Sequence, residues 1–479
     1  MIRGKYQIMS AVLIGLAMSA GPLSAQGVRP NVNTPAGAQM LASYARAIEV
    51  MRRLPANDPH SWSFQANLHG FVAGTPNPSP MWGQCQHGNW WFLSWHRTYL
   101  HCFEKIIRVH SGDANFALPY WDWSDATSRS LPTAFRATGS PLYDGTRRAS
   151  VNNGSDALDE SVIVSDVNYA LSRTAFFSVS LNDAADTFGG VRVTEPSHFH
   201  AGSGALELSP HNYVHGWVGG NMGDPDRAAR DPLFFLHHAN VDRLWDLWLA
   251  SGDRANPTSE PIWMNQGFTL FDENKRPVTL AARDMLNTRT QLNYVYADRL
   301  LQAVRAAAAK RPPQVKFASG QRPKPRVQLV LEPQKPWGDL KKVPMQIALK
   351  IDAAEAGPLY QLARKDKVAK GELVLVVEGI SFGAGVADSP LELFLNLPAN
   401  ANQPAIKQRY LADRTAFFGH AHNGTARFRL GEAFERVRTQ EGFRPEALTF
   451  TLARNWYGAT PPATPLPVTF KRVTIQVEQ

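Results

Sequence analysis

Cysteine is scarce in this chain: Cys85 and Cys102 are the only two among 479 residues. The two cysteines do not have zinc-finger spacing. Because there are only two, they can form at most one disulfide. In an exported protein two cysteines favour such a bond. A Cys85–Cys102 disulfide is therefore one alternative that the sequence leaves open.

Long basic runs are also absent, although the formal net charge is +9. No nucleic-acid-binding helix accompanies the charge, and a nucleic-acid surface needs clustered lysine and arginine. We interpret the charge as a solubility feature. Apolar content is 44% and charged content is 19%, as in an ordinary globular protein. We predict no nucleic-acid partner.

After its first residues, the chain has no apolar stretch long enough to cross a membrane. The N-terminus has the form of a secretory signal, in which Arg3 and Lys5 precede a short apolar stretch at 8–18. It has no twin-arginine pair, and Ala25 fits a cleavage point. We predict that residues 1–25 are removed and that the protein is exported to a bacterial periplasm or secreted, without stable membrane association.

Acidic residues are missing between Asp298 and Glu332, where basic residues and prolines gather. This composition is typical of a solvated linker, which we place at residues 305–335. Beyond it, apolar and polar residues alternate with a period of two, and turns rich in Gly and Pro separate the short runs. The pattern predicts an all-β sandwich or barrel over residues 336–479.

The first half of the chain has helical periodicity instead. Helices are predicted at residues 36–54, 96–110, 210–218 and 232–250. Residues 124–200 are rich in Ser, Asp, Asn, Gly and Thr, and are predicted to be mostly surface loop. We therefore expect a mainly α domain, a helical bundle, at residues 26–304.

Six histidines form two groups of three: His69, His87 and His96, then His211, His215 and His238. Three neutral imidazoles leave a metal with open positions where a small molecule can bind and react. His211 and His215 are four apart, so a helix puts both rings on one face. His238 and its neighbour His237 point about 100° apart on a helix. Spacing alone does not choose between them.

The first group cannot lie on one helix, because His87 and His96 would be about 13 Å apart along it. His87 is therefore expected in a loop that folds back, His96 near the start of the following helix, and His69 in another segment. The other eight histidines are interpreted as core or surface residues: His60, His101, His110, His198, His200, His237, His420 and His422.

Two stretches carry a family resemblance. Residues 87–104, HGNWWFLSWHRTYLHCFE, resemble the first copper signature of the tyrosinase, catechol oxidase and molluscan haemocyanin family, and residues 231–243, DPLFFLHHANVDR, resemble the second. The similarity extends from about residue 36 to 300. More weakly, the strand-rich tail resembles the C-terminal domain of plant polyphenol oxidases.

The resemblance implies a helical bundle that holds two copper ions, and imidazole-only ligation suits copper. Carried over residue by residue, it assigns His69, His87 and His96 to the first copper, and His211, His215 and His238 to the second. The family pattern thereby selects His238 over His237. It further implies that the copper pair binds O2 and acts on small phenolic substrates. A copper-delivery partner stays an open question.

Cys85-Gln86-His87 resembles the Cys-x-His arrangement that fungal tyrosinases and molluscan haemocyanins use for a thioether bond to a copper-ligand imidazole. Residues i and i+2 face the same way in an extended chain, so the sulfur can reach the ring. We favour this thioether over the disulfide. Cys102 then stays a buried free thiol.

Glu207 and Asn212 are implied, by the same resemblance, to hold a water that takes the phenolic proton. A phenol has a pKa of about 10 and binds copper as phenolate, so a nearby base helps. The alternative for Glu207 is an acid that complements a helix N-terminus. Asp242 is expected either to orient the ring of His238 or to form a structural ion pair with Arg243 or another cation.

The substrate entrance is expected near four residues. Gly216 follows His215 and leaves that wall small, and Pro225 aligns where plant enzymes often carry a bulky Phe gate, which suggests an open entrance. In the tail, Phe417 and Phe418 are candidates for side chains that cover the copper pocket. The alternative for these two is an ordinary pair of aromatics at a strand end.

The function expected from the resemblance is o-hydroxylation of monophenols followed by oxidation of o-diphenols to o-quinones. One alternative is a catechol oxidase that lacks the first step. Another, from a different class, is a haemocyanin-like reversible O2 carrier, although a single exported chain with one copper pair argues against transport. A zinc hydrolase is the most distant alternative.

Overall fold

The computed structural model describes residues 27–299 and separate segments of the second half of the chain: 328–331, 347–350, 373–382, 391–397, 411–415, 424–438, 448–454, 468–469 and 472–477. The expected signal segment 1–25, most of the expected linker 305–335, and both Phe417 and Phe418 lie outside these residues.

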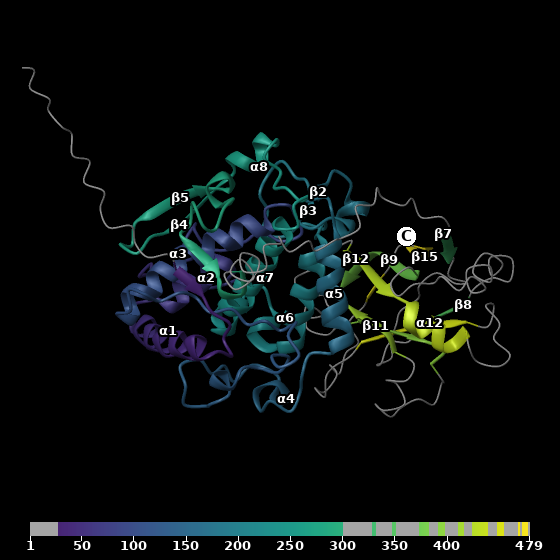
Figure 1. The fold of residues 1–479 in the computed structure, drawn as a ribbon, viewed down its shortest axis with the longest axis horizontal. Coiled ribbons are helices and arrows are strands. Elements are labelled where there is room, and N and C mark those ends of the chain that lie inside the picture. The colour runs from purple at the N-terminus through teal and green to yellow at the C-terminus, as the bar shows by residue number, and fades with distance from the viewer. Residues whose placement is uncertain are drawn as a thin grey trace, which may run out of the picture.

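Helices are the main regular elements of residues 27–299, which lie together on one side of the molecule in Figure 1. The α-helices are α1 (Pro35–Arg53), α2 (Trp62–His69), α3 (Phe92–Ser111), α4 (Ala149–Asn152), α5 (Glu160–Ser172), α6 (Asn212–Val218), α7 (Leu233–Leu249) and α8 (Pro261–Asn265). A π-helical turn, η3 (Glu207–His211), leads into α6. Single 3-10 turns are η1 (Thr133–Phe135), η2 (Leu181–Asp186), η4 (Gly220–Gly223), η5 (Ala228–Arg230) and η6 (Ala282–Met285).

Short strands complete this part: β1 (Gly27–Arg29), β2 (Phe177–Ser178), β3 (Gly190–Val191), β4 (Gly267–Phe271), β5 (Pro277–Ala281) and β6 (Tyr294–Tyr296). β1 pairs in parallel with β6, so the two ends of the helical part lie side by side. β4 and β5 form an antiparallel hairpin.

The predicted helices are present, and their ends follow local capping. α1 begins after Thr34, whose hydroxyl accepts the N–H of Gly37 at 3.1 Å, with Pro35 in the first turn, where a missing N–H costs nothing. α3 begins at Phe92 rather than near residue 96. The expected helix at 210–218 is divided between η3 and α6.

Most of residues 124–200 lies outside helices and strands, as expected, but the range also contains the short α4 and the longer α5. The residues of α5 that face the core recur at helical spacing: Val162, Ile163, Asp166, Val167 and Ala170. The loop-forming composition on either side of α5 hides this periodicity when the whole range is averaged. The helix matters for the site, because α5 packs against η3.

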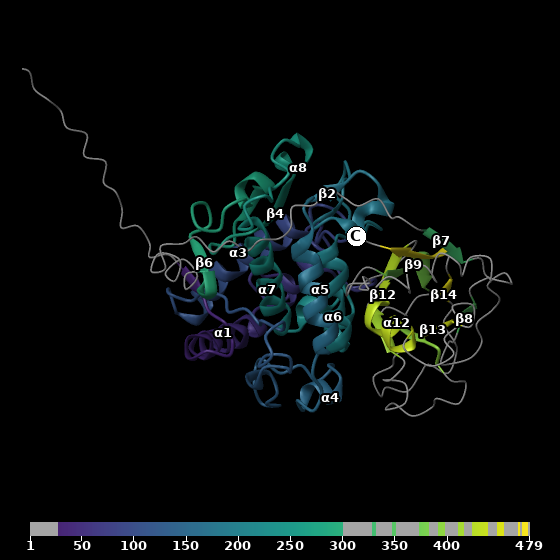
Figure 2. The ribbon, with the colours of Figure 1, turned by 45° about the vertical axis from the view of Figure 1, so that its right-hand side comes forward.

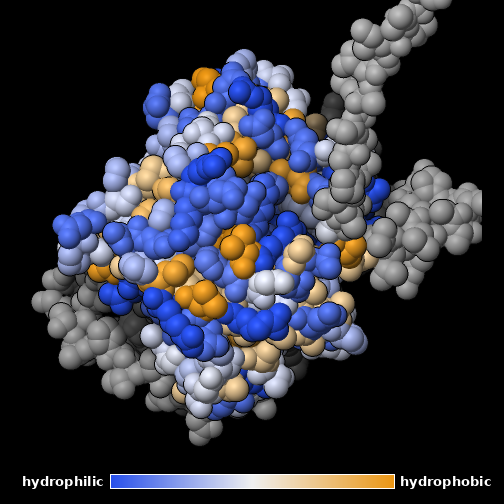
Figure 3. Space-filling model, turned by 90° about the vertical axis from the view of Figure 1, so that its left-hand side faces the viewer, coloured by the Kyte–Doolittle hydropathy of each residue, from blue (hydrophilic) through white to orange (hydrophobic). Residues whose placement is uncertain are grey.

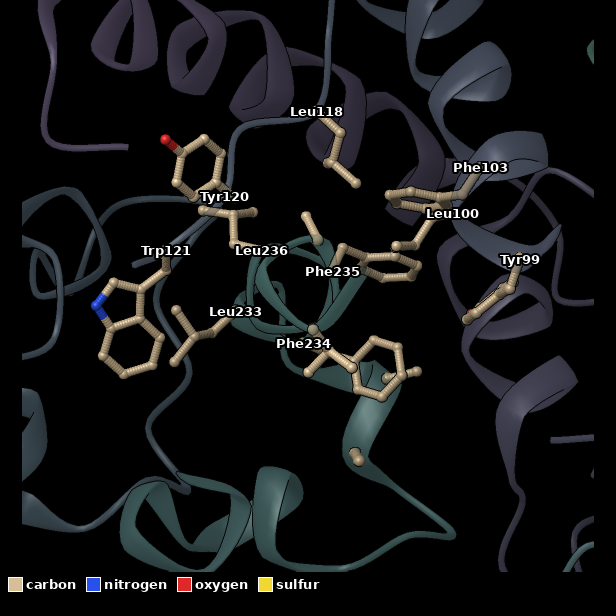
Figure 4. Close-up of a cluster of buried hydrophobic side chains, with 14 of the residues drawn as sticks. Tyr99, Leu100, Phe103, Leu118, Tyr120, Trp121, Leu233, Phe234, Phe235 and Leu236 are labelled. Carbon is tan, nitrogen blue, oxygen red and sulfur yellow. The ribbon is translucent and has the colours of Figure 1, made fainter. Parts of the chain in front are cut away.

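α7 forms the centre of the hydrophobic core. Its first turn is apolar on every side, and Figure 4 shows Leu233, Phe234, Phe235 and Leu236 pointing in different directions into surrounding side chains. The rings of Phe235 and Phe103 of α3 stack with centroids 3.5 Å apart. A helix that is hydrophobic all round must be buried, and this burial fixes the position of the histidines that follow.

A buried ionic cluster joins α7 to both ends of the helical part. Asp242 accepts hydrogen bonds from Arg29 of β1 and from Arg97 of α3, and also from the hydroxyls of Tyr294 and Tyr296 in β6. Both guanidinium groups also lie 3.6 Å from an aromatic ring centroid, that of Tyr294 for Arg29 and that of Trp245 for Arg97. Of the two roles expected for Asp242, the ion pair is therefore the observed one; the cation is not Arg243, which pairs with Asp122 and Asp298.

The described residues of the tail form two antiparallel sheets, as the period of two predicts. One sheet has the order β11-β10-β13-β8 and the other β12-β9-β15-β7, with β14 paired to β9. Their bounds are β7 (Gln328–Leu331), β8 (Ile347–Lys350), β9 (Leu373–Phe382), β10 (Leu391–Leu395), β11 (Leu411–Thr415), β12 (Gly424–Arg429), β13 (Thr449–Arg454), β14 (Val468–Thr469) and β15 (Arg472–Val477). A helix, α12 (Gly431–Arg438), follows β12. β7 lies within the range expected to be linker and pairs with β15.

α5 faces the sheets of the tail in both ribbon views (Figures 1 and 2). At this boundary Arg429 of β12 donates to the hydroxyl of Ser165 at 2.7 Å and forms an ion pair with the buried Asp166. Asp166 also accepts a hydrogen bond from the hydroxyl of Ser209 in η3. A chain of polar contacts thus runs from the tail through α5 to the segment that precedes His211.

Figure 3 shows one face of the helical part as mainly hydrophilic with isolated hydrophobic residues, which is normal for a globular protein. Among the described residues, no helix combines the length and the apolar character that a bilayer span requires.

Candidate metal centre

The structure brings the first three histidines together from three segments. His69 is the last residue of α2, His87 lies in the loop before α3, and His96 lies in the second turn of α3. Their ring centroids are separated by 5.2 Å (His69 to His87), 5.3 Å (His87 to His96) and 5.5 Å (His69 to His96). This arrangement agrees with the loop and helix positions that the spacing predicts.

The second three histidines converge through their Nε2 atoms. His211 ends η3, His215 lies one turn further in α6, and His238 comes from α7. The Nε2 atom of His238 is 3.3 Å from Nε2 of His211 and 3.3 Å from Nε2 of His215. Neutral imidazoles whose Nε2 atoms converge in this way present their lone pairs to one site.

The two triads face each other. The rings of His96 and His238 are stacked, with centroids 4.2 Å apart and planes 8° from parallel. His87 and His211 face each other across a centroid distance of 6.2 Å. All six side chains are buried. Two metals held by these triads would be neighbours in one pocket.

Backbone carbonyl groups orient most of the rings. Nδ1 of His69 lies 3.0 Å from the carbonyl of Pro225, that of His96 lies 2.8 Å from the carbonyl of Phe92, and that of His215 lies 2.7 Å from the carbonyl of Met222. A carbonyl can only accept, so each Nδ1 carries the hydrogen and each Nε2 keeps its lone pair. The Nε2 atoms of His69 and His96 are buried and have no hydrogen-bond partner among the described residues.

Burial keeps these imidazoles neutral. It lowers the pKa of His69, His87, His96, His215 and His238 well below the usual value, and neighbouring histidines add to the effect. Burial also lowers the pKa of His211 to about 3. A neutral imidazole is the form that binds a metal, so the site is prepared for metal without deprotonation at neutral pH.

His237 also reaches the second triad. The spacing in the sequence could not decide between His237 and His238 as the ligand. Ligand atoms of His211, His215, His237 and His238 all lie within 4.8 Å of one another. Nδ1 of His237, however, accepts a hydrogen bond from the indole of Trp123 at 3.0 Å. The Nδ1 lone pair of His237 is therefore engaged by Trp123, whereas His238 points its Nε2 to the two other rings.

Cys85 lies against His87, with Sγ 3.2 Å from Nδ1 of the ring. Both cysteines are free and buried in the structure, so the expected Cys85–Cys102 disulfide alternative is absent. The sulfur has a second neighbour that the sequence did not suggest. Nδ1 of His198 lies 3.0 Å from Sγ, although His198 was expected to be a plain loop residue.

Glu207 and Asn212 both lie beside the triads. The Glu207 carboxylate accepts the N–H of Gly88 at 2.7 Å, next to His87, and its other oxygen has no hydrogen-bond partner among the described residues. Burial raises the pKa of Glu207 to about 8, although the hydrogen bond from Gly88 opposes this. Asn212 places Oδ1 2.9 Å from Nδ1 of His211. Glu207 begins the π-helical turn, yet its carboxylate is directed to the Gly88 N–H.

The residues expected at the entrance have other contacts as well. Pro225 is buried and its carbonyl orients His69, so it is a brace of the first triad. The carbonyl of Gly216 accepts a hydrogen bond from Arg148 at 2.7 Å. Two aromatic residues beside the triads were not indicated by the histidine spacing. Phe199 stacks on His87 with ring centroids 5.5 Å apart, and the ring centroid of Phe92 lies 4.8 Å from that of His211.

Two family models match the chain over adjoining ranges. The common central domain of tyrosinase matches residues 59–251, and the polyphenol oxidase middle domain matches residues 258–309. The chain belongs to the tyrosinase and polyphenol oxidase family. The first of these ranges contains all six histidines of the two triads.

Among relatives in this family, a tyrosinase of Hahella sp. (strain CCB-MM4) is 37% identical over 289 residues, which cover 53% of this chain and 60% of the relative. Polyphenol oxidase A1 of Vicia faba, a chloroplastic protein, is 30% identical over 386 residues, which cover 73% of this chain and 61% of the relative. The chain thus spans about 60% of the length of these relatives.

Solved structures of the tyrosinase and polyphenol oxidase family share the fold, including the tail. Latent apple tyrosinase is 24% identical, with a TM-score of 0.54, over 95% of this chain and 97% of its own. Recombinant latent aurone synthase is 23% identical, with a TM-score of 0.56, over 95% and 90%. The expected fold class, a helical core followed by strands, is confirmed.

The cofactor that fits these residues is a pair of copper ions. The donors are buried, neutral imidazoles, which suit copper. The lone pairs left on Nε2 of His69 and His96 face the interior of the site. The family expectation of binuclear copper therefore agrees with what the side chains can bind.

Proposed function

We propose that this protein is a phenol oxidase that uses O2 at a binuclear copper site, hydroxylating monophenols at the ortho position and oxidising o-diphenols to o-quinones. The observation that supports this most is the convergence of two buried triads, with the rings of His96 and His238 stacked 4.2 Å apart. The proposed ligands are His69, His87 and His96 for one ion, and His211, His215 and His238 for the other.

The chain supplies the proton chemistry and the positioning. When bound, the copper pair would supply O2 binding and electron transfer. Glu207, which has a raised pKa, is the proposed acceptor of the phenolic proton, since a base whose pKa is near the working pH is effective. Asn212 is proposed to assist by holding, together with Glu207, the water that takes this proton. Phe199 and Phe92 present apolar ring faces beside the triads, which suits a flat phenol.

Oxygen consumption tests this proposal and its alternatives. Full-length protein loaded with copper should consume O2 with both a monophenol, such as tyrosine, and a catechol. O2 uptake with catechols alone would identify a catechol oxidase. Reversible O2 binding without consumption would identify a carrier and overturn the enzyme proposal. Activity with zinc and none with copper would overturn the choice of metal.

We further propose a thioether bond between Cys85 and the imidazole of His87. The support is the 3.2 Å contact between Sγ and Nδ1 and the two-residue spacing in an extended loop. A fixed bond would hold the His87 ring, whose Nδ1 faces a sulfur where other ligand rings face a carbonyl. Cys102, buried in α3, would keep its thiol.

The domain limits are also part of the proposal: a signal peptide at 1–25, a catalytic domain at 26–304, a linker at 305–335 and a shielding β domain at 336–479. Export to the periplasm or medium, and small phenols as the substrates, belong with it. The strand β7 lies within the proposed linker range and pairs with β15, which supports a cleavage site before residue 328. Gly216, Pro225, Phe417 and Phe418 remain the proposed entrance and cover residues.

The tail is proposed to restrain activity, and Arg429 offers a way to test this. Substitution Arg429→Gln removes the ion pair to Asp166 and should loosen the tail from α5. We expect a severalfold rise in phenol oxidation, in the same direction as cleavage within 305–327. The assay is O2 uptake on copper-loaded, full-length protein before and after limited proteolysis.

The matched control for Arg429 is Arg436→Gln. Arg436 lies in α12 of the same part and donates to the carbonyl of Leu411 at 2.8 Å, within the tail. This variant should keep the activity of the original protein. If Arg429→Gln and cleavage both leave the activity of soluble, copper-loaded protein unchanged, the tail does not restrain it.

A further inference from the structure

His198 forms part of an arrangement around Cys85 that neither triad requires. Its Nδ1 atom lies 3.0 Å from Sγ of Cys85, and Sγ lies 3.2 Å from Nδ1 of His87. The sulfur is therefore held between two imidazoles. Cys85 is fully buried, whereas a quarter of the His198 side chain is exposed.

The loop that carries His198 is bound to the loop that carries Cys85 and His87. The N–H of His200 donates to the carbonyl of His87 at 2.9 Å, and the N–H of Ser197 donates to the side chain of Gln86 at 2.9 Å. Gly88 approaches so closely that a Cβ there would lie 1.7 Å from the carbonyl oxygen of His200. The two loops thus form one unit, and the contact of His198 with the sulfur is not an isolated surface contact.

Asp226 determines which nitrogen of His198 carries the hydrogen. Its carboxylate lies 3.4 Å from Nε2 of His198, and a carboxylate can only accept. Nε2 therefore carries the hydrogen, and Nδ1 is left as an acceptor directed to Sγ. The carbonyl of Cys85 lies 3.3 Å from the same Nδ1 and could also accept a hydrogen bond, but the charged carboxylate of Asp226 is the stronger acceptor. The hydrogen therefore stays on Nε2, and the thiol is the donor available to Nδ1. Asp226 directly follows Pro225, whose carbonyl orients His69, so one short segment braces both rings.

We propose that His198, with its tautomer fixed by Asp226, is the hydrogen-bond acceptor that positions the thiol of Cys85 for bonding to the ring of His87. The inference rests on the thioether proposed above and names the residues that make it form. The S–H···Nδ1 hydrogen bond turns the hydrogen away from His87 and leaves the sulfur lone pairs toward that ring. Without it, a buried thiol can rotate about its Cα–Cβ bond.

The bond formation balances with O2 as the oxidant. The new bond joins Sγ to Cε1, the ring carbon next to Nδ1 that carries a hydrogen. One hydrogen leaves sulfur, along the bond to His198, and one leaves carbon; together they amount to two protons and two electrons. One O2, the oxidant of the proposed activity, accepts them to give H2O2. The thiol hydrogen needs an acceptor at this step, and Nδ1 of His198, 3.0 Å from Sγ, is the nitrogen placed to take it.

The test follows the cross-link itself rather than activity. Full-length protein is prepared without copper, then given copper in air, and the peptide containing Cys85 and His87 is followed by mass spectrometry together with a count of free thiols. The original protein should lose two hydrogens and retain only the Cys102 thiol. His198→Ala and Asp226→Asn should slow the cross-link by about ten- to a hundredfold, the usual cost of losing an outer-shell partner.

His200→Ala is the matched control, because His200 is exposed on the same loop and its contacts to the His87 loop use the backbone. It should cross-link at the original rate. Added imidazole should restore part of the rate in His198→Ala, which a purely structural role would not allow. Copper content, measured in every variant, checks that each one is loaded.

Three outcomes would overturn the inference. Cross-linking of His198→Ala at the original rate would remove His198 from the step. A slow His198→Ala that imidazole does not rescue would make the residue structural only. If the unsubstituted protein oxidises phenols while keeping two free thiols, both the thioether and this inference are wrong. The phenol oxidase proposal is not affected by that result.

Discussion

Replacing His238 with asparagine should remove one of the two copper ions and lower phenol oxidation by more than about a hundredfold, beyond the usual cost of losing an outer-shell partner. His238 contributes the Nε2 atom that lies 3.3 Å from those of both His211 and His215, so its loss leaves a two-ligand site. It also removes the ring that stacks on His96 across the pocket. The measurements are copper per chain and O2 uptake with a catechol.

The control for His238 is its neighbour in the sequence. His237→Gln changes a ring that reaches the same cluster but already accepts a hydrogen bond from Trp123. This variant should keep both copper ions and most of its activity, because a glutamine oxygen can replace that acceptor. If His237→Gln lost copper while His238→Asn kept it, the ligand of the second site would be His237.

Replacing Asp242 with asparagine should lower the free energy of unfolding by about 3–5 kcal/mol, the cost of removing one partner from a buried ion pair. Asp242 is the carboxylate shared by the guanidinium groups of Arg29 and Arg97, both fully buried. An amide neutralises neither cation. Arg29 keeps Glu104, at 2.9 Å, but among the described residues Arg97 keeps only the carbonyl of Met285 as a hydrogen-bond acceptor.

Asp246→Asn provides the same change one turn further along α7. Asp246 pairs with Arg299, and both side chains are about a quarter exposed, so this substitution should cost about 0–1 kcal/mol. Urea unfolding of copper-free protein, followed by tryptophan fluorescence, compares the two variants. Equal midpoints for both would mean that the buried cluster contributes no more than a surface pair.

The sequence predicted the elements whose pattern is local. The helical period predicted the bounds of α1, α3 and α7 to within a few residues, and the period of two predicted strands in the tail. The spacing of the histidines also indicated which of them lie in a loop and which on a helix. These features depend on neighbours along the chain, which is the information that a single sequence contains.

What the sequence could not predict are contacts between distant segments. His198 reaches Cys85 across 113 positions, and nothing in its local sequence distinguished it from the other core or surface histidines. α5 was missed because its thirteen residues lie within a range whose composition is that of a loop. Asp242 lies one turn after His238, and that spacing left open a hydrogen bond to the ring or an ion pair. The decisive partners instead come from β1 and β6.

The pairing of β1 with β6 sets the shortest fragment that can keep the metal pocket. Arg29 enters the interior from the first strand, and Tyr294 and Tyr296 enter from the last, so all three meet on one carboxylate. Trimming from the front must stop before Gly27, and trimming from the back must stop after Tyr296. A protease that removed a few more residues at either end would strip a hydrogen-bond partner of Asp242 from the interior, and not merely a loose terminus.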